Sequence, residues 1–578
     1  MTPIKIWRSP DSGFGVWSAT VSDLNDETVT AEKIYTDEEL KKIADSGFNA
    51  IWIHGQLHNF IPSKYFSEFA PNSAIHQTAL HVLIERAAKY NIKVYIYMQP
   101  PRAIAADAEF LEKYKDCIGF TGTAVGDDGK QITYSTLCTS VKYVRDYIQD
   151  SFATLAETFP DLGGIIIISA SEYPAHCYCR ANIKNNSTRK RKLKMDFVPT
   201  PCPRCGEREP EEVVIEHLHT IRNGVRSVSN DMKIIFWNWS WSMYLDPPCA
   251  EIIEKLPHDC ILMADFERGG YREDGTFINE YSLSYAGPSE QFLDSMQCAK
   301  RNNVSILAKL QLGTTHELAT VCSLPLIHSI YRKIRFIREN DIKGFMGCWN
   351  FGNQQSANTA AANYFFEVPL NITENDAVKQ FAAYYFPGCD AEKTAKAWEL
   401  FYKTMSVFPF NVPFIYDGVL NHAIGLLPPP GPVSGKIVGR SWLPDERGDD
   451  YRHSVTEEFP LDAIIERMSN IADNWQQAMK FLNEGIGSLN DEHSKIEYGN
   501  AVIVGCIWAA TANLYKIYKL KLNWNNDSMP EYNKLAGTAK DIIRTALPYV
   551  KQDPRQGFHI EGRFYSFNAE IMEAILNS

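Results

Sequence analysis

The carboxylic acid of Glu172 follows a segment that reads as a buried strand. Residues 163–169 run Gly-Gly-Ile-Ile-Ile-Ile-Ser, and Glu172 comes three residues after that run ends. A continuous apolar run of this kind is typical of a strand buried on both faces, as the strands of parallel sheets are. In a (β/α)8 barrel, catalytic side chains stand at the carboxyl ends of the strands. The position of Glu172 therefore predicts a catalytic acid.

Two more carboxylates follow a later apolar run. Asp265 and Glu267 alternate in the segment Ala264-Asp265-Phe266-Glu267, so in an extended chain they point to the same side. Cleavage of a glycosidic bond needs one protonated carboxyl to donate to the leaving oxygen and one carboxylate to activate water or attack carbon. We expect Glu172 to be the general acid and either Asp265 or Glu267 to be the base. The alternative for each is a structural carboxylate that caps a helix or pairs with an arginine.

The residues that follow the other apolar runs are of the types that bind sugars. Aromatic rings stack on the C–H faces of pyranose rings, while amides, imidazoles and cationic groups bind hydroxyls or a carboxylate. The candidate substrate-binding residues are His54, Gln99, Arg102, Asn238, Trp239, Trp241, Arg272, Lys309, Gln311, Trp349 and Asn350. Four cationic residues, Arg102, Arg268, Arg272 and Lys309, would suit a uronic or sialic acid. Core packing is the alternative for the three tryptophans.

Four cysteines have the spacing of a metal site. Cys177 and Cys179 form a C-x-C pair, and Cys202 and Cys205 form a C-x-x-C pair. Four thiolates suit a tetrahedral zinc ion and leave no open coordination position, so we expect a structural zinc in an insertion at residues 173–212. The chain has thirteen cysteines, and this odd, scattered set argues against a disulfide framework.

The spacing of apolar runs predicts the elements that position these residues. Eight strand-like runs are separated by amphipathic segments; they lie at 13–17, 49–53, 94–98, 165–168, 234–237, 261–264, 306–308 and 345–349. Eight strand–helix repeats predict an α/β protein with a (β/α)8 barrel at 1–370. A doubly wound open sheet is the alternative. Apolar residues at helical spacing then predict an all-helical domain at 371–578.

Composition restricts the partners. The 578-residue chain has a net charge of −12, which disfavours binding to nucleic acid or to anionic lipid. The basic run at 189–194 is interpreted as a solvated loop. No signal-like or membrane-spanning stretch is visible, so we expect a cytoplasmic protein with no membrane partner. A homo-oligomer is left open.

Together these residues resemble barrel glycoside hydrolases, in particular the family 20 β-hexosaminidases and the family 67 α-glucuronidases. Family 20 enzymes place an Asp-Glu pair after strand four, where this chain has Ser171-Glu172, so substrate assistance by an acetamido group is disfavoured. The resemblance to the α-glucuronidases implies an inverting mechanism and a helical carboxyl-terminal domain. The cysteine insertion belongs to neither pattern.

The sequence therefore predicts an exo-acting, inverting glycoside hydrolase that removes a terminal sugar from oligosaccharides. One alternative is a carbohydrate-binding barrel that has lost its catalytic activity. Another is a substrate-assisted N-acetylhexosaminidase. A metal-dependent hydrolase using His54 is a third.

Overall fold

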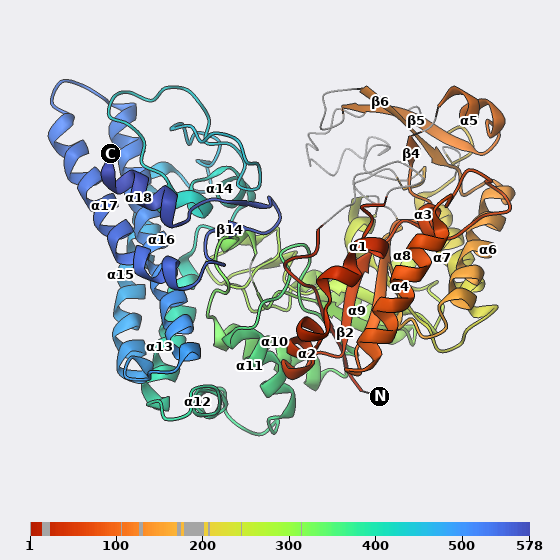
Figure 1. Cartoon of the computed structure of the whole chain (residues 1–578), viewed down its shortest axis with the longest axis horizontal. Helices are drawn as coiled ribbons and strands as arrows, with labels where there is room; N and C mark the ends of the chain where they lie inside the picture. The colour runs from red at the N-terminus through yellow and green to blue at the C-terminus, as the bar shows by residue number, and fades with distance from the viewer. Residues whose placement is uncertain are drawn as a thin grey trace. The chain divides into compact units, whose positions relative to one another are not determined.

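The computed structural model describes residues 2–13, 24–105, 107–125, 131–169, 175–177, 202–205, 208–243, 245–313 and 315–578 (Figure 1). The chain divides into two compact units. Unit 1 comprises Met1–Asp265, Gln291–Lys309 and Ile342–Met346, and unit 2 comprises Phe266–Glu290, Leu310–Asp341 and Gly347–Ser578. The domain boundary near residue 370 stays a prediction.

Eight parallel strands close into a barrel in unit 1. Neighbouring strands around the barrel are β1 (Ile4–Trp7), β13 (Gly344–Met346), β12 (Ser305–Lys309), β9 (Ile261–Asp265), β8 (Lys233–Trp237), β7 (Gly164–Ile167), β3 (Lys93–Met98) and β2 (Ala50–His54). Every neighbouring pair is parallel. Because the strands follow one another around the barrel in chain order, the predicted (β/α)8 barrel is confirmed.

Glycines allow two of these strand pairs to approach closely. A Cβ atom on Gly344 would lie 2.0 Å from the carbonyl oxygen of Ile4, and Gly344 has a φ of +132°. Gly164 would place its Cβ 2.3 Å from the carbonyl oxygen of Lys233. A side chain at either position would therefore collide with the neighbouring backbone, and at Gly344 it would also be strained.

The predicted first strand was wrong. The sequence pattern placed it at 13–17, whereas the first barrel strand is β1, in which Ile4 pairs with Gly344. Gly13 is outside any strand, and residues 14–17 lie outside the described part of the chain. The short β1 contains Lys5, so its apolar pattern is weak, and both of its neighbours are distant in sequence. The other seven predicted strands overlap the strands of the structure.

Helices connect the barrel strands. In unit 1 they include α1 (Glu27–Ile34), α2 (Asp37–Asp45), α4 (Ser73–Ala88), α6 (Lys142–Thr158), α7 (Pro210–Arg226) and α9 (Glu290–Arg301). The start of α2 shows why such helices begin where they do. The Thr36 side chain accepts a hydrogen bond from the backbone N–H of Glu39 and so caps the helix. Three acidic residues in the first turn also interact favourably with the positive end of the helix dipole. A small antiparallel sheet, β4 (Ile104–Ala105), β6 (Gln131–Leu137) and β5 (Ile118–Val125), follows β3.

Unit 2 is largely helical. It contains α10 (Ile327–Glu339), α11 (Ala357–Glu367), α12 (Glu374–Tyr385), α13 (Ala391–Thr404), α14 (Val412–Asp417), α15 (Leu461–Ile486), α16 (Glu492–Leu522), α17 (Met529–Gln552) and α18 (Ala569–Asn577). Helices α15, α16 and α17 run side by side (Figure 1). Helix α16 is long and apolar enough to cross a membrane, but 78% of its most apolar window is buried inside the protein, as in a core helix. The predicted helical carboxyl-terminal region is confirmed.

Candidate functional site

The carboxyl ends of the barrel strands bring several predicted residues to one rim of unit 1. Asp265, His54 and Lys309 are the last residues of β9, β2 and β12. Because all eight strands are parallel, their carboxyl ends meet at the same end of the barrel. Strands β9 and β12 are neighbours, and Asp265 and Lys309 are paired in register. The rim therefore carries a carboxylate beside a lysine.

The carboxylate of Asp265 is oriented by a tryptophan on the neighbouring strand. Trp237, the last residue of β8, donates a hydrogen bond from Nε1 to Oδ1 of Asp265 at 3.0 Å. Trp237 is 1% exposed, whereas Asp265 is half-buried. A buried indole thus holds one oxygen of a carboxylate that keeps access to solvent. A general base needs such access, because it must reach the group from which it takes a proton.

On the opposite side of β7, polar residues lie at the carboxyl ends of β2 and β3. Gln99 donates to the hydroxyl of Tyr97 at 2.6 Å and accepts from Nη1 of Arg102 at 2.8 Å. The ring of His54 lies 5.5 Å from that of Tyr97, between centroids. Burial, with Arg102 and Arg8 nearby, lowers the pKa of His54 well below its ordinary value, so its imidazole is neutral. A neutral imidazole and an amide suit the binding of sugar hydroxyls.

A short 3-10 helix, Asn238–Met243, carries the predicted residues after β8. Asn238 is half-buried and donates to Oγ of Ser295 at 3.3 Å. Trp241 is 1% exposed and donates from Nε1 to Oγ of Ser169 at 2.9 Å. Trp239 is half-buried. Trp239 therefore has more surface for stacking on a sugar than Trp241, whose contacts are those of a core residue.

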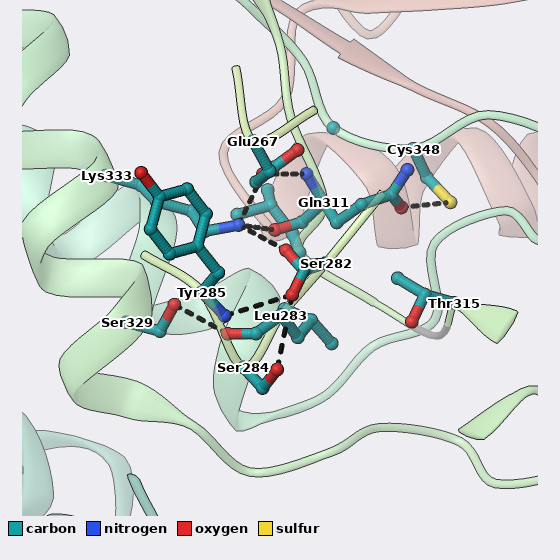
Figure 2. A network of polar contacts seen from close by, with 12 residues as sticks. Glu267, Ser282, Leu283, Ser284, Tyr285, Gln311, Thr315, Ser329, Lys333 and Cys348 are labelled. Atoms are coloured by element: carbon teal, nitrogen blue, oxygen red, sulfur yellow. Dashed lines mark hydrogen bonds and ion pairs between the residues drawn. The ribbon is translucent and has the colours of Figure 1, made fainter. Parts of the chain in front are cut away.

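Glu267 lies in unit 2, in a buried polar network (Figure 2). Its Oε1 atom accepts hydrogen bonds from the ammonium of Lys333 and, at 3.0 Å, from the backbone N–H of Gln311. The side chains of Glu267 and Lys333 are both 0% exposed. Lys333 also donates to the carbonyl oxygens of Ser282 and Gln311. Through these contacts the Glu267 carboxylate neutralises the buried ammonium of Lys333.

Gln311 and Arg272 are also part of the buried interior of unit 2. The side-chain oxygen of Gln311 accepts from the thiol of Cys348 at 3.4 Å. Arg272 donates to the carbonyl oxygen of Phe408 at 2.6 Å and to the hydroxyl of Ser284. Two further predicted residues of unit 2, Trp349 and Asn350, are half-buried. Thus the eleven predicted substrate-binding residues fall into two groups. Seven lie in unit 1, as Asp265 does, and the other four lie in unit 2.

Two predicted residues, Glu172 and Cys179, lie outside the described part of the chain. The strand that precedes Glu172 is described: β7 is wholly buried, and it is followed by Ile168 and Ser169. The role of Glu172 stays a prediction.

Four buried thiols come together in unit 1. They belong to Cys138, Cys177, Cys202 and Cys205, and their sulfur atoms all lie within 4.8 Å of one another. Cys138 was missed in the sequence because it has no partner at a metal-site spacing; it follows β6 and lies far upstream of the other three. Among the described residues, these four cysteines are the one group of at least three potential metal ligands that the structure brings together.

The four thiols fit a tetrahedral metal ion. A tetrahedron with metal–sulfur distances of about 2.3 Å places the sulfurs about 3.8 Å apart. The sulfur of Cys138 lies 3.5 Å from that of Cys202 and 3.6 Å from that of Cys205. The cluster could therefore hold a metal ion.

Comparisons with known proteins identify the fold. No protein-family model and no curated protein match the sequence. The chain is similar to a solved GH138 enzyme targeting pectin rhamnogalacturonan II, with a TM-score of 0.55 and 10% identity over 96% of this chain and 62% of that chain. It thus spans less than two thirds of that enzyme. A GH5-4 broad specificity endoglucanase from Ruminococcus champanellensis has a TM-score of 0.36 and 9% identity over 64% of this chain and 96% of that chain. The first similarity is one of fold alone, and the second is too low to support a conclusion.

Proposed function

We propose that the chain is an exo-acting glycoside hydrolase whose active site lies at the carboxyl ends of the barrel strands. The observation that carries this proposal is the half-buried carboxylate of Asp265, held by Trp237 at the end of β9. Neutral His54 and the Gln99 and Arg102 pair, at the same rim, supply groups that bind hydroxyls. The fold shared with a GH138 enzyme is consistent with this activity.

Asp265 is the base in this proposal and Glu172 is the acid. Asp265 is favoured over Glu267 because the Glu267 carboxylate is wholly buried against Lys333. A carboxylate that neutralises a buried ammonium is not available to activate water without leaving that cation unpaired. Glu172 would donate a proton to the leaving oxygen while Asp265 takes one from water, which inverts the configuration at the anomeric carbon.

The test is a panel of aryl glycosides and oligosaccharides with product configuration followed by NMR. Pectic oligosaccharides are included first, since the GH138 enzyme of similar fold targets a pectin, together with uronides and N-acetylhexosaminides. Glu172→Gln and Asp265→Asn should each lower turnover by roughly two to four orders of magnitude. Glu254→Gln, at an exposed carboxylate of the same unit, is the matched control. Full turnover by either active-site variant would refute its assigned role.

We also propose that the cysteine cluster holds a structural zinc ion. Cys138, Cys177, Cys202 and Cys205 would bind it, and four sulfur ligands would leave no position for a substrate. The ion would then tie the segment around Cys202 to the end of β6. The cysteines must stay reduced to bind the metal as thiolates, and the cytosol keeps thiols reduced. We therefore propose that the protein is cytoplasmic.

A further inference from the structure

The cysteine cluster would concentrate negative charge in a buried place. Its members, Cys138, Cys177, Cys202 and Cys205, are each at most 1% exposed. Four thiolates around a divalent zinc ion leave a net charge of about −2. Charge that is removed from water is costly unless a group of opposite charge or a hydrogen-bond donor compensates it. If the cluster holds zinc, its neighbours must supply that compensation.

Arg204 is a cation in direct contact with the cluster. Its Nε atom donates a hydrogen bond to the sulfur of Cys138 at 3.5 Å. Through Nη2 the same guanidinium donates to the carbonyl oxygen of Ile118, on β5. Arg204 is half-buried, and among the described residues no carboxylate pairs with it. Its positive charge is therefore available to the sulfurs.

A second hydrogen bond reaches the cluster from Ser140. The hydroxyl oxygen of Ser140 lies 3.2 Å from the sulfur of Cys205. Arg208 donates from Nη1 to this oxygen at 2.8 Å, so the hydroxyl hydrogen can point to the sulfur. Arg208 itself is ion-paired with Glu216 at 3.1 Å. Ser140 therefore supplies a hydrogen bond to the cluster, whereas the charge of Arg208 is compensated by a carboxylate.

Strand β5 holds Arg204 in position. A Cβ atom on Gly119 would lie 2.4 Å from the sulfur of Cys177 and 2.8 Å from the hydroxyl oxygen of Thr136. Only glycine lets the strand pass so close to the cluster. The preceding residue, Ile118, then places its carbonyl oxygen where Arg204 can reach both it and Cys138. The guanidinium is thus fixed by the backbone as well as by the sulfur.

We propose that Arg204 sets the metal affinity of the cysteine cluster by compensating the negative charge of its thiolates. Arg204 is a positioning residue: it acts on the ion through the sulfur of Cys138 and is not itself a ligand. The inference rests on the proposed metal site. Residues that hydrogen-bond to metal ligands typically change metal affinity about 10–100-fold when they are replaced. Arg204 should have an effect of this size, because it brings both a donor and a charge.

Zinc titration of the full, reduced and metal-free chain against a chromophoric chelator tests the proposal. Arg204→Met should weaken zinc binding by about 10–100-fold. Arg204→Lys should recover most of that loss, because an ammonium keeps the positive charge beside the sulfurs. The matched control is Arg222→Met, since Arg222 lies on α7 in the same unit and pairs with Asp259. It should bind zinc as the wild type does.

Cobalt(II) in place of zinc gives a second measurement, the absorption band that arises from electron transfer from sulfur to the metal. Loss of a hydrogen bond and of a nearby positive charge raises the energy of the sulfur electrons. The band should therefore move to longer wavelength in Arg204→Met, whereas it should stay in place in Arg222→Met. A role for Arg204 in folding alone would change the amount of cobalt bound and leave the band where it is.

Zinc affinity of Arg204→Met within about twofold of wild type, well below the usual effect of such residues, would overturn the proposal. So would a cobalt band that does not move, or an Arg204→Lys chain that binds zinc as weakly as Arg204→Met. Should Arg204→Met fail to fold, Arg204→Gln, which keeps a donor but no charge, has the same expected result. A wild-type chain that binds neither ion refutes the metal site itself, whereas binding that does not depend on Arg204 refutes only this inference.

Discussion

Trp237 donates a hydrogen bond to Asp265 at 3.0 Å between neighbouring barrel strands, β8 and β9. The two residues end their strands at the same rim, so the bond fixes the direction of a carboxylate that remains partly open to solvent. Neither residue is adjacent to the other in sequence. The barrel alone creates this pair, and its removal can be tested.

Trp237→Phe should reduce kcat on a cleaved substrate by about ten- to a hundredfold with little change in KM. The loss of one hydrogen bond to a charged group, about 1.5–3 kcal/mol, accounts for this range. Steady-state kinetics measure the split between kcat and KM. Trp7→Phe is the control, since the indole N–H of Trp7 has no partner among the described residues. An unchanged kcat in Trp237→Phe would remove the bond from the mechanism.

Cys138→Ser should lower the metal content and the melting temperature. If Cys138 is a ligand, one of four sulfurs is lost and the remaining three bind zinc more weakly. Elemental analysis of the purified chain should give about one zinc per wild-type chain and clearly less in the variant. Cys260→Ser alters a buried cysteine outside the cluster and serves as the control. Equal zinc in wild type and Cys138→Ser would exclude Cys138 as a ligand.

Lys333→Met should destabilise the protein by about 3–5 kcal/mol, because it leaves the buried carboxylate of Glu267 without its cation. Adding Glu267→Gln should restore most of the loss, since the amide oxygen still accepts from the N–H of Gln311. Denaturant unfolding of both single variants and the double variant gives the coupling energy. A large loss of turnover in Glu267→Gln at unchanged stability would instead make Glu267 the base.

Acid should destabilise the protein partly through His559. Burial lowers the pKa of His559 to about 3 in the folded chain, while the unfolded chain has the ordinary value of about 6.5. The unfolded state therefore binds more protons in this window, so the stability from His559 is complete above about pH 6.5 and decreases toward about pH 3. Between about pH 6.5 and pH 5 this amounts to about 2 kcal/mol.

His559→Asn should reduce that loss on acidification. The asparagine oxygen can replace Nδ1 of His559 as the acceptor for the N–H of Gly562, but it does not titrate. Denaturant unfolding at about pH 7.5 and pH 5 would measure the difference between the two stabilities in each chain. An equal difference in wild type and variant would show that His559 does not contribute to acid sensitivity.

The sequence predicted the barrel because buried parallel strands are continuous apolar runs. Residues 165–168 and 261–264 illustrate this, because the first run overlaps β7 and the second lies within β9, and the side chains of both strands are almost wholly buried. It did not predict β1, since four residues that include Lys5 carry little periodic signal. Only the pairing of Ile4 with Gly344, at the other end of the barrel sequence, identifies that strand.

Residue types at strand ends were also readable, since an apolar run that stops at a polar residue marks a strand end. Asp265 and Lys309 were found in this way. What the pattern could not supply is the partner of each side chain. Tertiary structure decided that Asp265 faces Trp237 while Glu267 faces Lys333, and that Cys138 joins Cys202 and Cys205. Local sequence reports which positions are buried, whereas the chemistry of a carboxylate or thiol depends on neighbours that the folded backbone brings from far along the chain.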